Sequence, residues 1–437
     1  MTKRDIIEAA FQVWGRTLYQ HTSLEPVARA LGVTKPALYR HFKNKERLWD
    51  GMYEYFFDGY AAAIRPAYEQ ALAVKEAFER LLIFNESVVR YYSRNMDAFL
   101  FALIKVYEGQ EIGAIIPHFK KRGIDMRVFF SQEYNQGYPS LSHLTGATTI
   151  FWLAQFHKYD HAPESLPSDA ETSRLAALIR EKIIQGLGAS REAAEGVDFC
   201  RLEELAAASL PAIPQEAGLL KAVAEAVAEA GPWKASMDMV ARRSGLSKSG
   251  LYAHFKNKQA MLGRLFSTEF ERLISYVQMN KEKSAVPLEK RYLAVIAIAD
   301  YLRAKPDILA VIDWVRTQKL ELGIANPAGL CQLLEGAGGN GRKGLPDDTR
   351  VEAERNAQWV LFLIVTMLMR PPPGIPCSRM PNESFRILFR FIGCGAGAFL
   401  QDQATPIQPA DRPGAADTRT APKPAPHNGA GNHAVPG

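Results

Sequence analysis

Two short stretches of the 437-residue sequence place lysine, tyrosine and histidine at the same spacing. Residues 33–48 read VTKPALYRHFKNKERL, and residues 246–261 read LSKSGLYAHFKNKQAM. Both contain the pattern K-x-x-L-Y-x-H-F-K-N-K. Ammonium groups and phenolic hydroxyls at fixed spacing are suited to hydrogen bonds with phosphate oxygens. The two stretches therefore predict a pair of surfaces that bind a polyanion.

The distribution of charge supports this prediction. The formal net charge is +6. Residues 1–50 hold nine Lys/Arg and five Asp/Glu, or +4, and residues 214–262 hold seven and four, or +3. The rest of the chain therefore sums to about −1. The basic excess surrounds the two repeated stretches, as expected of segments that meet a nucleic acid.

The elements that must position these residues are predicted to be helices. Ser23 is placed to cap a short helix that ends at Gly32, because glycine takes a left-handed conformation at little cost. Thr34 is predicted to cap the next helix by accepting a bond from an early backbone N–H. Two helices joined by such a turn form a helix-turn-helix, whose second helix can lie in the DNA major groove.

The candidate DNA contacts lie at the start of this second helix and along it. In the first copy they are Thr34, Lys35, Pro36, Ala37, Tyr39 and Arg40. In the second copy they are Ser247, Lys248, Ser249, Gly250 and Tyr252. The positive end of the helix dipole adds to the attraction for phosphate.

A further candidate follows in each copy. Asn44 is predicted to cap the next helix, which leaves Lys45 in its first turn with its ammonium free. A cation is unfavourable at a helix start, so a nearby phosphate explains this placement better. Lys258 repeats it. The alternatives are partly buried rings for Tyr39 and Tyr252 and solvated surface charges for the lysines.

Beyond these stretches the sequence predicts an all-α fold of two consecutive, related units. Residues 22–49 and 235–262 share thirteen identities in 28 positions, and a period this long indicates a domain duplication. Apolar residues recur at helical spacing, and no alternating strand pattern is present. Each unit closes with two long apolar helices, at 144–159 and 171–187 in the first and at 353–369 and 383–400 in the second.

Six segments are expected along the chain. Clusters of Gly, Pro and Ala mark a linker that has room for one short helix, and the C-terminal segment has almost no large apolar residues. The segments are helix-turn-helix domains at 1–50 and 214–263, helical bodies at 51–190 and 264–401, a linker at 191–213 and a disordered tail at 402–437.

The repeated stretches resemble the N-terminal DNA-binding signature of the TetR family of transcriptional regulators. The match rests on VARALGVTKPALYRHFKNKERL and VARRSGLSKSGLYAHFKNKQAM. It implies a three-helix DNA-binding head, a ligand-binding helical body, and dimerisation through the last two helices of the body. In the family, the positions lying at the DNA match Thr34, Lys35, Tyr39, Lys45, Ser247, Lys248, Tyr252 and Lys258.

The sequence departs from the family pattern in two ways. Leu18 stands where the second copy has Gly231, so the first loop is expected to differ in shape. Family members normally carry one copy and pair two chains, whereas this chain carries two. We expect its halves to pack through their closing helices as an intramolecular pseudo-dimer, and a homodimer with four heads is the alternative.

The expected function is that of a ligand-responsive DNA-binding transcriptional regulator that acts as a repressor. Its two heads differ where bases would be read, which predicts an operator that is an imperfect palindrome. The differing pairs are Pro36 and Ser249, Ala37 and Gly250, and Arg40 and Ala253. One alternative is a small-molecule-binding helical protein in which only one head retains DNA binding.

An enzyme is the other alternative, but the sequence contains no P-loop, no G-x-S-x-G and no H-E-x-x-H. The aromatic side chains of the first body suit a small hydrophobic or aromatic effector, and no cofactor is expected. HKYDH, residues 157–161, holds two histidines four residues apart, and we expect a helix end there rather than a metal site.

The expected location is the cytoplasm. Four scattered cysteines without C-x-x-C pairing suggest reduced thiols, and the first residues contain no apolar region of the signal-peptide type. The longest apolar run, residues 359–369, has eleven residues, whereas a membrane-spanning helix needs about 20.

Overall fold

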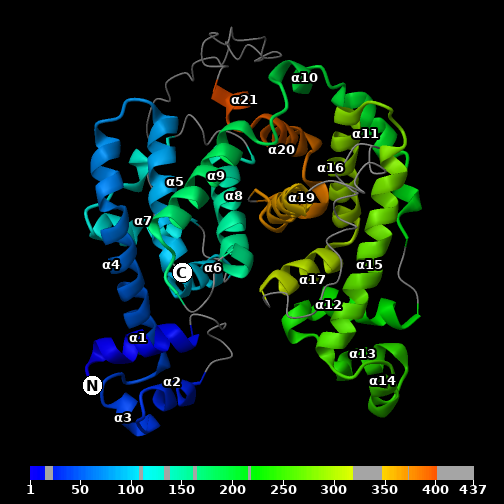
Figure 1. Cartoon of the computed structure of the whole chain (residues 1–437). Coiled ribbons are helices and arrows are strands. Elements are labelled where there is room, and N and C mark those ends of the chain that lie inside the picture. Colours follow the sequence, from blue (N-terminus) through cyan, green and yellow to red (C-terminus); the bar gives the residue numbers. More distant parts are fainter. Residues whose placement is uncertain are drawn as a thin grey trace, which may run out of the picture. The chain divides into compact units, whose positions relative to one another are not determined.

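The computed structural model describes the chain in eight stretches. They are residues 1–14, 23–107, 112–131, 138–160, 165–214, 218–317, 347–372 and 374–400. Every regular element in these stretches is a helix, which confirms the all-α prediction (Figure 1). Among them, no helix is long and apolar enough to cross a membrane. The predicted disordered tail lies outside the described residues.

The first head is a three-helix unit with a closed core. Trp14 and Leu38 are almost fully buried in it, and Trp14 Nε1 donates a hydrogen bond to the carbonyl oxygen of Ser23 at 3.1 Å. Its helices are α1 (Lys3–Trp14), α2 (Glu25–Ala30) and α3 (Lys35–Tyr39).

The second head repeats this arrangement. Its helices are α12 (Gly218–Lys234), α13 (Met237–Ser244) and α14 (Lys248–His254). Gly231 interrupts α12 with a φ of 71° and a ψ of 160°, a conformation that glycine adopts at little cost. Leu18, its counterpart, lies outside the described residues, so the different loop shape stays a prediction.

The first body is a helical bundle that starts with α4 (Lys45–Leu72), a helix that begins in the head and extends away from it (Figure 1). Its other helices are α5 (Ala77–Arg94), α6 (Met96–Tyr107), α7 (Ile112–Lys121), α8 (Leu141–Gln155) and α9 (Asp169–Gln185). A π-helical turn at Phe156–Asp160 continues α8.

The second body likewise starts with a long helix, α15 (Lys258–Lys281), which continues directly from the second head. The other helices are α16 (Pro287–Ala304), α17 (Pro306–Thr317), α19 (Asp347–Met369), α20 (Asn382–Cys394) and α21 (Gly397–Leu400). Along α16 nearly every residue from Tyr292 to Leu302 is buried, so this helix is central to the second core.

The segment predicted as a linker is packed against the second body. It holds two α-helices rather than one, α10 (Arg191–Glu195) and α11 (Phe199–Ala207). Glu203 on α11 accepts hydrogen bonds from the Tyr292 hydroxyl at 2.6 Å and from Arg386 Nε at 2.7 Å. The connection between the halves is therefore held in place by α16 and α20.

The predicted closing helices of the two halves pack against each other. Where α8 meets α19, Trp359 Nε1 donates to Thr148 Oγ1 at 3.2 Å, and both side chains are buried. Farther along, Arg355 donates to both carboxylate oxygens of Asp160. A buried hydrogen bond and a bidentate ion pair thus join the halves within one chain.

A second contact joins the ends of α9 and α20 through their backbones. The amide of Leu187 donates to Ile392 O at 2.8 Å, and that of Ala396 donates to Ile183 O at 2.7 Å. A Cβ atom on Gly186 would come within 2.4 Å of Ile392 O. This close approach requires glycine at the crossing.

Candidate functional site

The turn of each helix-turn-helix forms as predicted. Gly32 and Gly245 have φ values of 64° and 71°, in the left-handed region. In the second head Ser247 caps α14, since its Oγ accepts from Gly250 N at 3.0 Å. Ser247 and the α14 residues that follow it are thus held at the end of the helix that carries the positive dipole.

The first head lacks the two predicted side-chain caps. Thr34 has the extended backbone of an N-cap, but its side chain accepts no capping bond, so that prediction is wrong. Pro36 has no N–H, and the amide of Ala37 already donates to the Thr34 carbonyl oxygen at 2.9 Å. Ser23 does not cap α2 either, because Leu24 takes the N-cap position.

Most of the candidate contacts are exposed on their heads. Tyr39 is 44% exposed and Tyr252 is 45% exposed, so neither ring belongs to a core. Leu38 and Leu251, which precede them, are buried and anchor the two helices. The other exposed candidates are Thr34, Lys35, Pro36, Arg40, Ser247, Lys248 and Ser249. Ala37 and Gly250 are half-buried.

The lysines that follow each motif are less open than predicted. Asn44 caps α4 as expected, because its Oδ1 accepts from Arg47 N at 2.9 Å. Lys45, however, is half-buried, with its Nζ 5.9 Å from the centre of the Trp14 ring, and burial lowers its pKa. The predicted free ammonium is therefore wrong. Lys258 is half-buried in the same way, and burial lowers its pKa too.

The two heads differ in how their cations are balanced. Lys248 Nζ lies 3.1 Å from Asp238 Oδ1, and hydrogen bonding to this carboxylate raises the pKa of the lysine. Arg243 also forms ion pairs within the second head, with Glu225 and Glu229. Within the described part of the chain, no such pair involves Lys35. The first head thus presents the less compensated cation.

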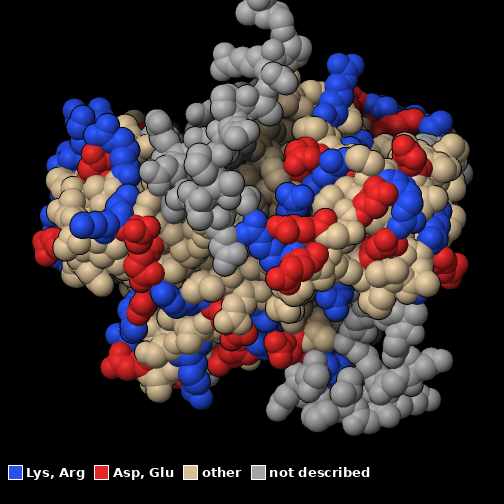
Figure 2. All heavy atoms as spheres, turned by 90° about the horizontal axis from the view of Figure 1, so that it is seen from above, with Lys and Arg blue, Asp and Glu red and all other residues tan. Residues whose placement is uncertain are grey.

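Seen from the top of Figure 1, the molecule carries side chains of both charges. There, basic and acidic groups are interspersed over the described surface (Figure 2). The described part of this face therefore presents no continuous basic surface to a polyanion.

The repeated heads match a known protein family. The model for bacterial regulatory proteins of the tetR family matches the chain twice, at residues 6–52 and 219–265. Both heads are therefore TetR-family DNA-binding domains, and the chain carries them as a tandem duplication. Each match covers most of one head and the start of α4 or α15.

Two relatives from Mycobacterium tuberculosis agree with this assignment. Both are named as uncharacterised HTH-type transcriptional regulators, one from strain CDC 1551 / Oshkosh and one from strain ATCC 25618 / H37Rv. Each is 24% identical over 153 residues, which is 35% of this chain and 74% of the relative. A chain with two such heads is accordingly a DNA-binding transcriptional regulator.

The first body encloses an apolar cavity of about 520 Å³. Helices α4, α5, α6, α7 and α8 supply its walls, and aromatic rings form much of them. They include Phe56, Phe57, Tyr60, Phe84, Phe99 and Phe101. Its volume falls within the range of small-molecule sites, about 300–1,000 Å³.

The histidine pair singled out in the sequence lies near this body. His157 belongs to the π-helical turn after α8, and its Nε2 is 2.9 Å from the carbonyl oxygen of Tyr92. His161 lies outside the described residues. Among those described, no cluster of His, Cys, Asp and Glu could hold a metal ion.

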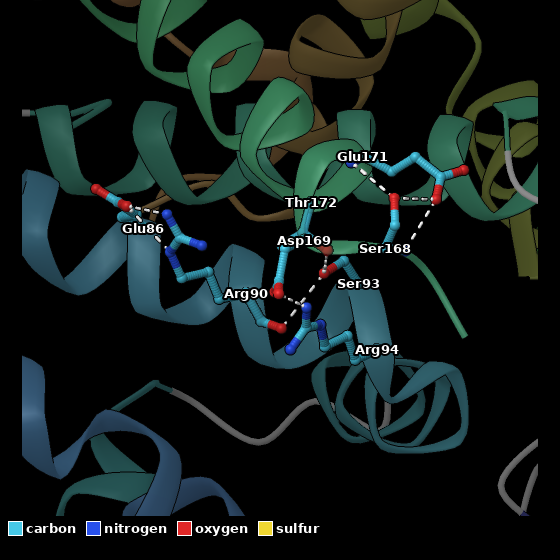
Figure 3. A network of polar contacts seen from close by, with 8 residues as sticks. All are labelled: Glu86, Arg90, Ser93, Arg94, Ser168, Asp169, Glu171 and Thr172. Atoms are coloured by element: carbon cyan, nitrogen blue, oxygen red, sulfur yellow. Dashed lines mark hydrogen bonds and ion pairs between the residues drawn. The ribbon is translucent and has the colours of Figure 1, made fainter.

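A polar network fixes α9, one of the closing helices, against the cavity wall helix α5 (Figure 3). Ser168 and Glu171 form a reciprocal capping box at the start of α9. Arg94 at the end of α5 pairs with Asp169, and the buried hydroxyls of Ser93 and Thr172 lie 3.4 Å apart. The wall of the cavity and the contact between the halves are thereby connected.

Sequence reasoning missed a buried ionic cluster in the second body. Glu269 on α15 is fully buried and accepts from Lys305 Nζ at 2.6 Å and from the Tyr301 hydroxyl at 2.8 Å. A signal was present, because Glu269 interrupts the apolar face of α15. Lys305 and Tyr301 lie more than 30 residues farther on, so the pattern alone could not connect them to Glu269.

Proposed function

We propose that this regulator is a repressor whose two heads bind unlike half-sites of one imperfect palindrome. The observation that carries the proposal is the pair of exposed, related but non-identical recognition surfaces in one chain. Half-sites bound by a two-fold reader are about 34–36 Å apart. A chain with two different heads can read two different half-sites, whereas a symmetric dimer reads identical ones.

The proposed contacts are those exposed on each head. Tyr39 and Lys35 in the first head, and Tyr252 and Lys248 in the second, are oriented by the buried leucines and are open to solvent. Lys45 and Lys258 are proposed to meet the phosphate backbone despite their partial burial. A nearby phosphate would raise the lowered pKa of each lysine and so favour its charged form.

The decisive experiment selects binding sites for the full chain from random DNA and then footprints the preferred sequence. The proposal predicts two protected half-sites that differ in sequence. The double variant Arg40→Ala with Ala253→Arg should reverse their preferred order. A strictly symmetric selected site, with identical half-sites, would contradict the proposal.

We also propose that the packed closing helices make the two-headed reader within a single chain. The buried bond between Trp359 and Thr148 and the backbone crossing at Gly186 support this arrangement. Light scattering of the complex with a selected site should give one chain per duplex. Two chains per duplex would favour the four-headed homodimer.

An effector bound in the first body is proposed to alter the geometry of the heads. Helix α4 supports this idea, because it contributes Phe56 and Tyr60 to the cavity and also begins at Lys45 in the first head. A ligand that shifts α4 would act directly on the head that it enters.

One observation favours the second candidate function, in which a single head provides most of the affinity. Lys248 is neutralised by Asp238, whereas no such pair involves Lys35 in the described part of the chain. Comparing Tyr39→Ala with Tyr252→Ala in a mobility-shift assay separates the two. Similar losses support two active heads, and a loss confined to Tyr39→Ala supports one.

A further inference from the structure

The two bodies differ at the position of the cavity. Helices α4 and α15 begin with matching lysines, Lys45 and Lys258, and Phe56 and Glu269 occupy the same place relative to them. Phe56 lines the cavity of the first body. Glu269 is fully buried in the second. An aromatic wall residue in one half is thus a carboxylate in the other.

The Glu269 carboxylate is held by groups from its own half. Lys305, at the end of α16, is 3% exposed and reaches one carboxylate oxygen, which the Tyr301 hydroxyl also contacts. Arg272, one turn along α15, donates to the other oxygen. A buried carboxylate needs such partners, and they join α15 to α16 where the first body has its cavity.

A second pair of helices corresponds between the two bodies. Helices α5 and α16 end in the same backbone conformation, at Asn95 and Lys305, with φ and ψ of −130° and 70° in one and −131° and 70° in the other. Counting back from these ends, Val295 stands where Asn85 lines the cavity, and Val295 is buried. The polar cavity residue of α5 is therefore replaced by a packed aliphatic side chain.

The next helix shows the same trend. Helices α6 and α17 each begin directly after these ends and have the same length of 12 residues. Phe99 and Phe101 in the cavity wall correspond to Leu309 and Val311, which are 3% and 0% exposed. At the matching positions the described part of the second body thus carries smaller side chains and the buried Glu269 cluster in place of the aromatic wall.

The first cavity has its own polar feature on α8. Thr145 and Thr149 lie one turn apart in its wall, and Asn85 Nδ2 donates to Thr149 Oγ1. Thr145 is 1% exposed, yet its hydroxyl has no hydrogen-bond partner among the described residues. A buried hydroxyl without a partner is costly, and a ligand that bonds to it removes that cost.

The remaining wall offers little to a charged ligand. Arg127, the one Lys or Arg among the residues described as lining the cavity, is already paired with Asp125. His143 also lines it, and burial lowers its pKa, which favours the neutral ring. A charged group brought into this apolar space would lose its hydration without gaining an opposite charge.

We infer that the chain takes one effector, in the first body only, and that this effector is a neutral, largely aromatic molecule with one hydrogen-bonding group that meets Thr145. The inference deepens the proposed ligand response, on which its biological meaning rests. The second body is the structural partner, closed by its own Glu269 cluster.

The test uses two dyes with the same ring system and the full chain. N-phenyl-1-naphthylamine is neutral and carries one N–H, whereas 8-anilino-1-naphthalenesulfonate adds a negative charge. We expect the neutral dye to bind saturably at one molecule per chain. The sulfonate should bind at least roughly tenfold more weakly. Two molecules of neutral dye per chain, or equal affinities for both dyes, would overturn the inference.

A cavity-filling variant locates the bound dye. An added Cβ at Gly146 on α8 meets nothing within 4 Å, and this residue lines the cavity, so Gly146→Leu places its side chain in open space. It should abolish binding of the neutral dye. Gly263→Leu on α15 is the matched control, because a Cβ there also meets nothing within 4 Å, and it should leave binding unchanged.

Thr145→Val tests the hydrogen bond while keeping the shape of the side chain. It should weaken binding of the neutral dye by roughly fivefold to tenfold.

Unchanged dye binding in Gly146→Leu, with its helical signal and thermal midpoint retained, would refute the location. Release of a selected DNA site is measured separately. Dye binding at one per chain without release would reject the ligand response but leave the binding site intact.

Discussion

Lys35 and Lys248 occupy the same position in their heads but have different electrostatic surroundings. Asp238 lies against Lys248, and hydrogen bonding to it raises the pKa of the lysine. DNA must compete with this carboxylate for the Lys248 ammonium. Both side chains are exposed, so the difference concerns binding to phosphate more than stability.

The first prediction concerns these two lysines. Lys35→Ala should weaken binding to all DNA sequences and reduce the slope of log K against log salt by about 0.9. Lys248→Ala should change the slope less, because the ammonium is already partly balanced. Fluorescence anisotropy at several salt concentrations measures both, with Lys158→Ala on the first body as a control. Equal slope changes would show that Asp238 has no influence.

Glu269 gives the second prediction. Glu269→Ala leaves the buried ammonium of Lys305 without its carboxylate, and it should lower the free energy of unfolding by about 3–5 kcal/mol. Urea unfolding measures the loss. Glu271→Ala, at an exposed position of the same helix, should shift the midpoint little. Similar midpoints for the two variants would mean that the buried cluster contributes no net stability.

At the scale of helices, the two recognition helices have the same place in their heads but begin differently. Ser247 caps α14 with its side chain, whereas α3 starts with a backbone turn at Thr34. The Gly250 amide donates to the Ser247 hydroxyl, whereas the matching Ala37 amide donates to the Thr34 carbonyl oxygen. The Thr34 hydroxyl has no capping role, which leaves it available as a DNA contact.

The third prediction follows from this difference. Ser247→Ala should lower the local stability of α14 by about 1 kcal/mol, since it removes the cap. Thr34→Ala should change the stability of α3 by less than about 0.5 kcal/mol. Hydrogen exchange of the backbone amides in each helix measures both. A comparable loss in α3 would indicate that Thr34 caps its helix in solution.

Many features of the helices could be predicted from the sequence. Glycine at 32 and 245, asparagine at 44 and the apolar spacing of the closing helices act locally, so their outcomes are visible in the pattern. The predicted Thr34 cap is wrong because the Ala37 amide donates to the Thr34 carbonyl oxygen rather than to the Thr34 hydroxyl. The burial of Lys45 depends on Trp14, and the Glu269 cluster on α16, both distant in sequence.

At the scale of the whole molecule, the contact between the halves is made by elements of a single chain. The ends of α9 and α20 exchange backbone hydrogen bonds where Gly186 lies close to Ile392 O. The segment that connects the halves is itself packed through Glu203. The contact between the halves and the segment that connects them are thus parts of one packed structure.

The fourth prediction tests the crossing. Gly186→Ala combines a positive φ with a clash against backbone, and it should lower the free energy of unfolding by about 2–4 kcal/mol. Gly188→Ala is the control, because its φ is also positive but a Cβ there meets nothing within 4 Å. It should cost about 1 kcal/mol. Equal urea midpoints for the two variants would show that the halves do not approach closely at Gly186.

The crossing at Gly186 also bears on how the regulator responds to its own abundance. A reader assembled from two separate chains falls apart on dilution, so its occupancy of DNA rises steeply with expression. In the proposed single-chain reader each interface surface is tethered to its partner, and their effective concentration stays fixed however few molecules a cell contains. Occupancy should therefore grow in simple proportion to copy number, down to a handful of molecules.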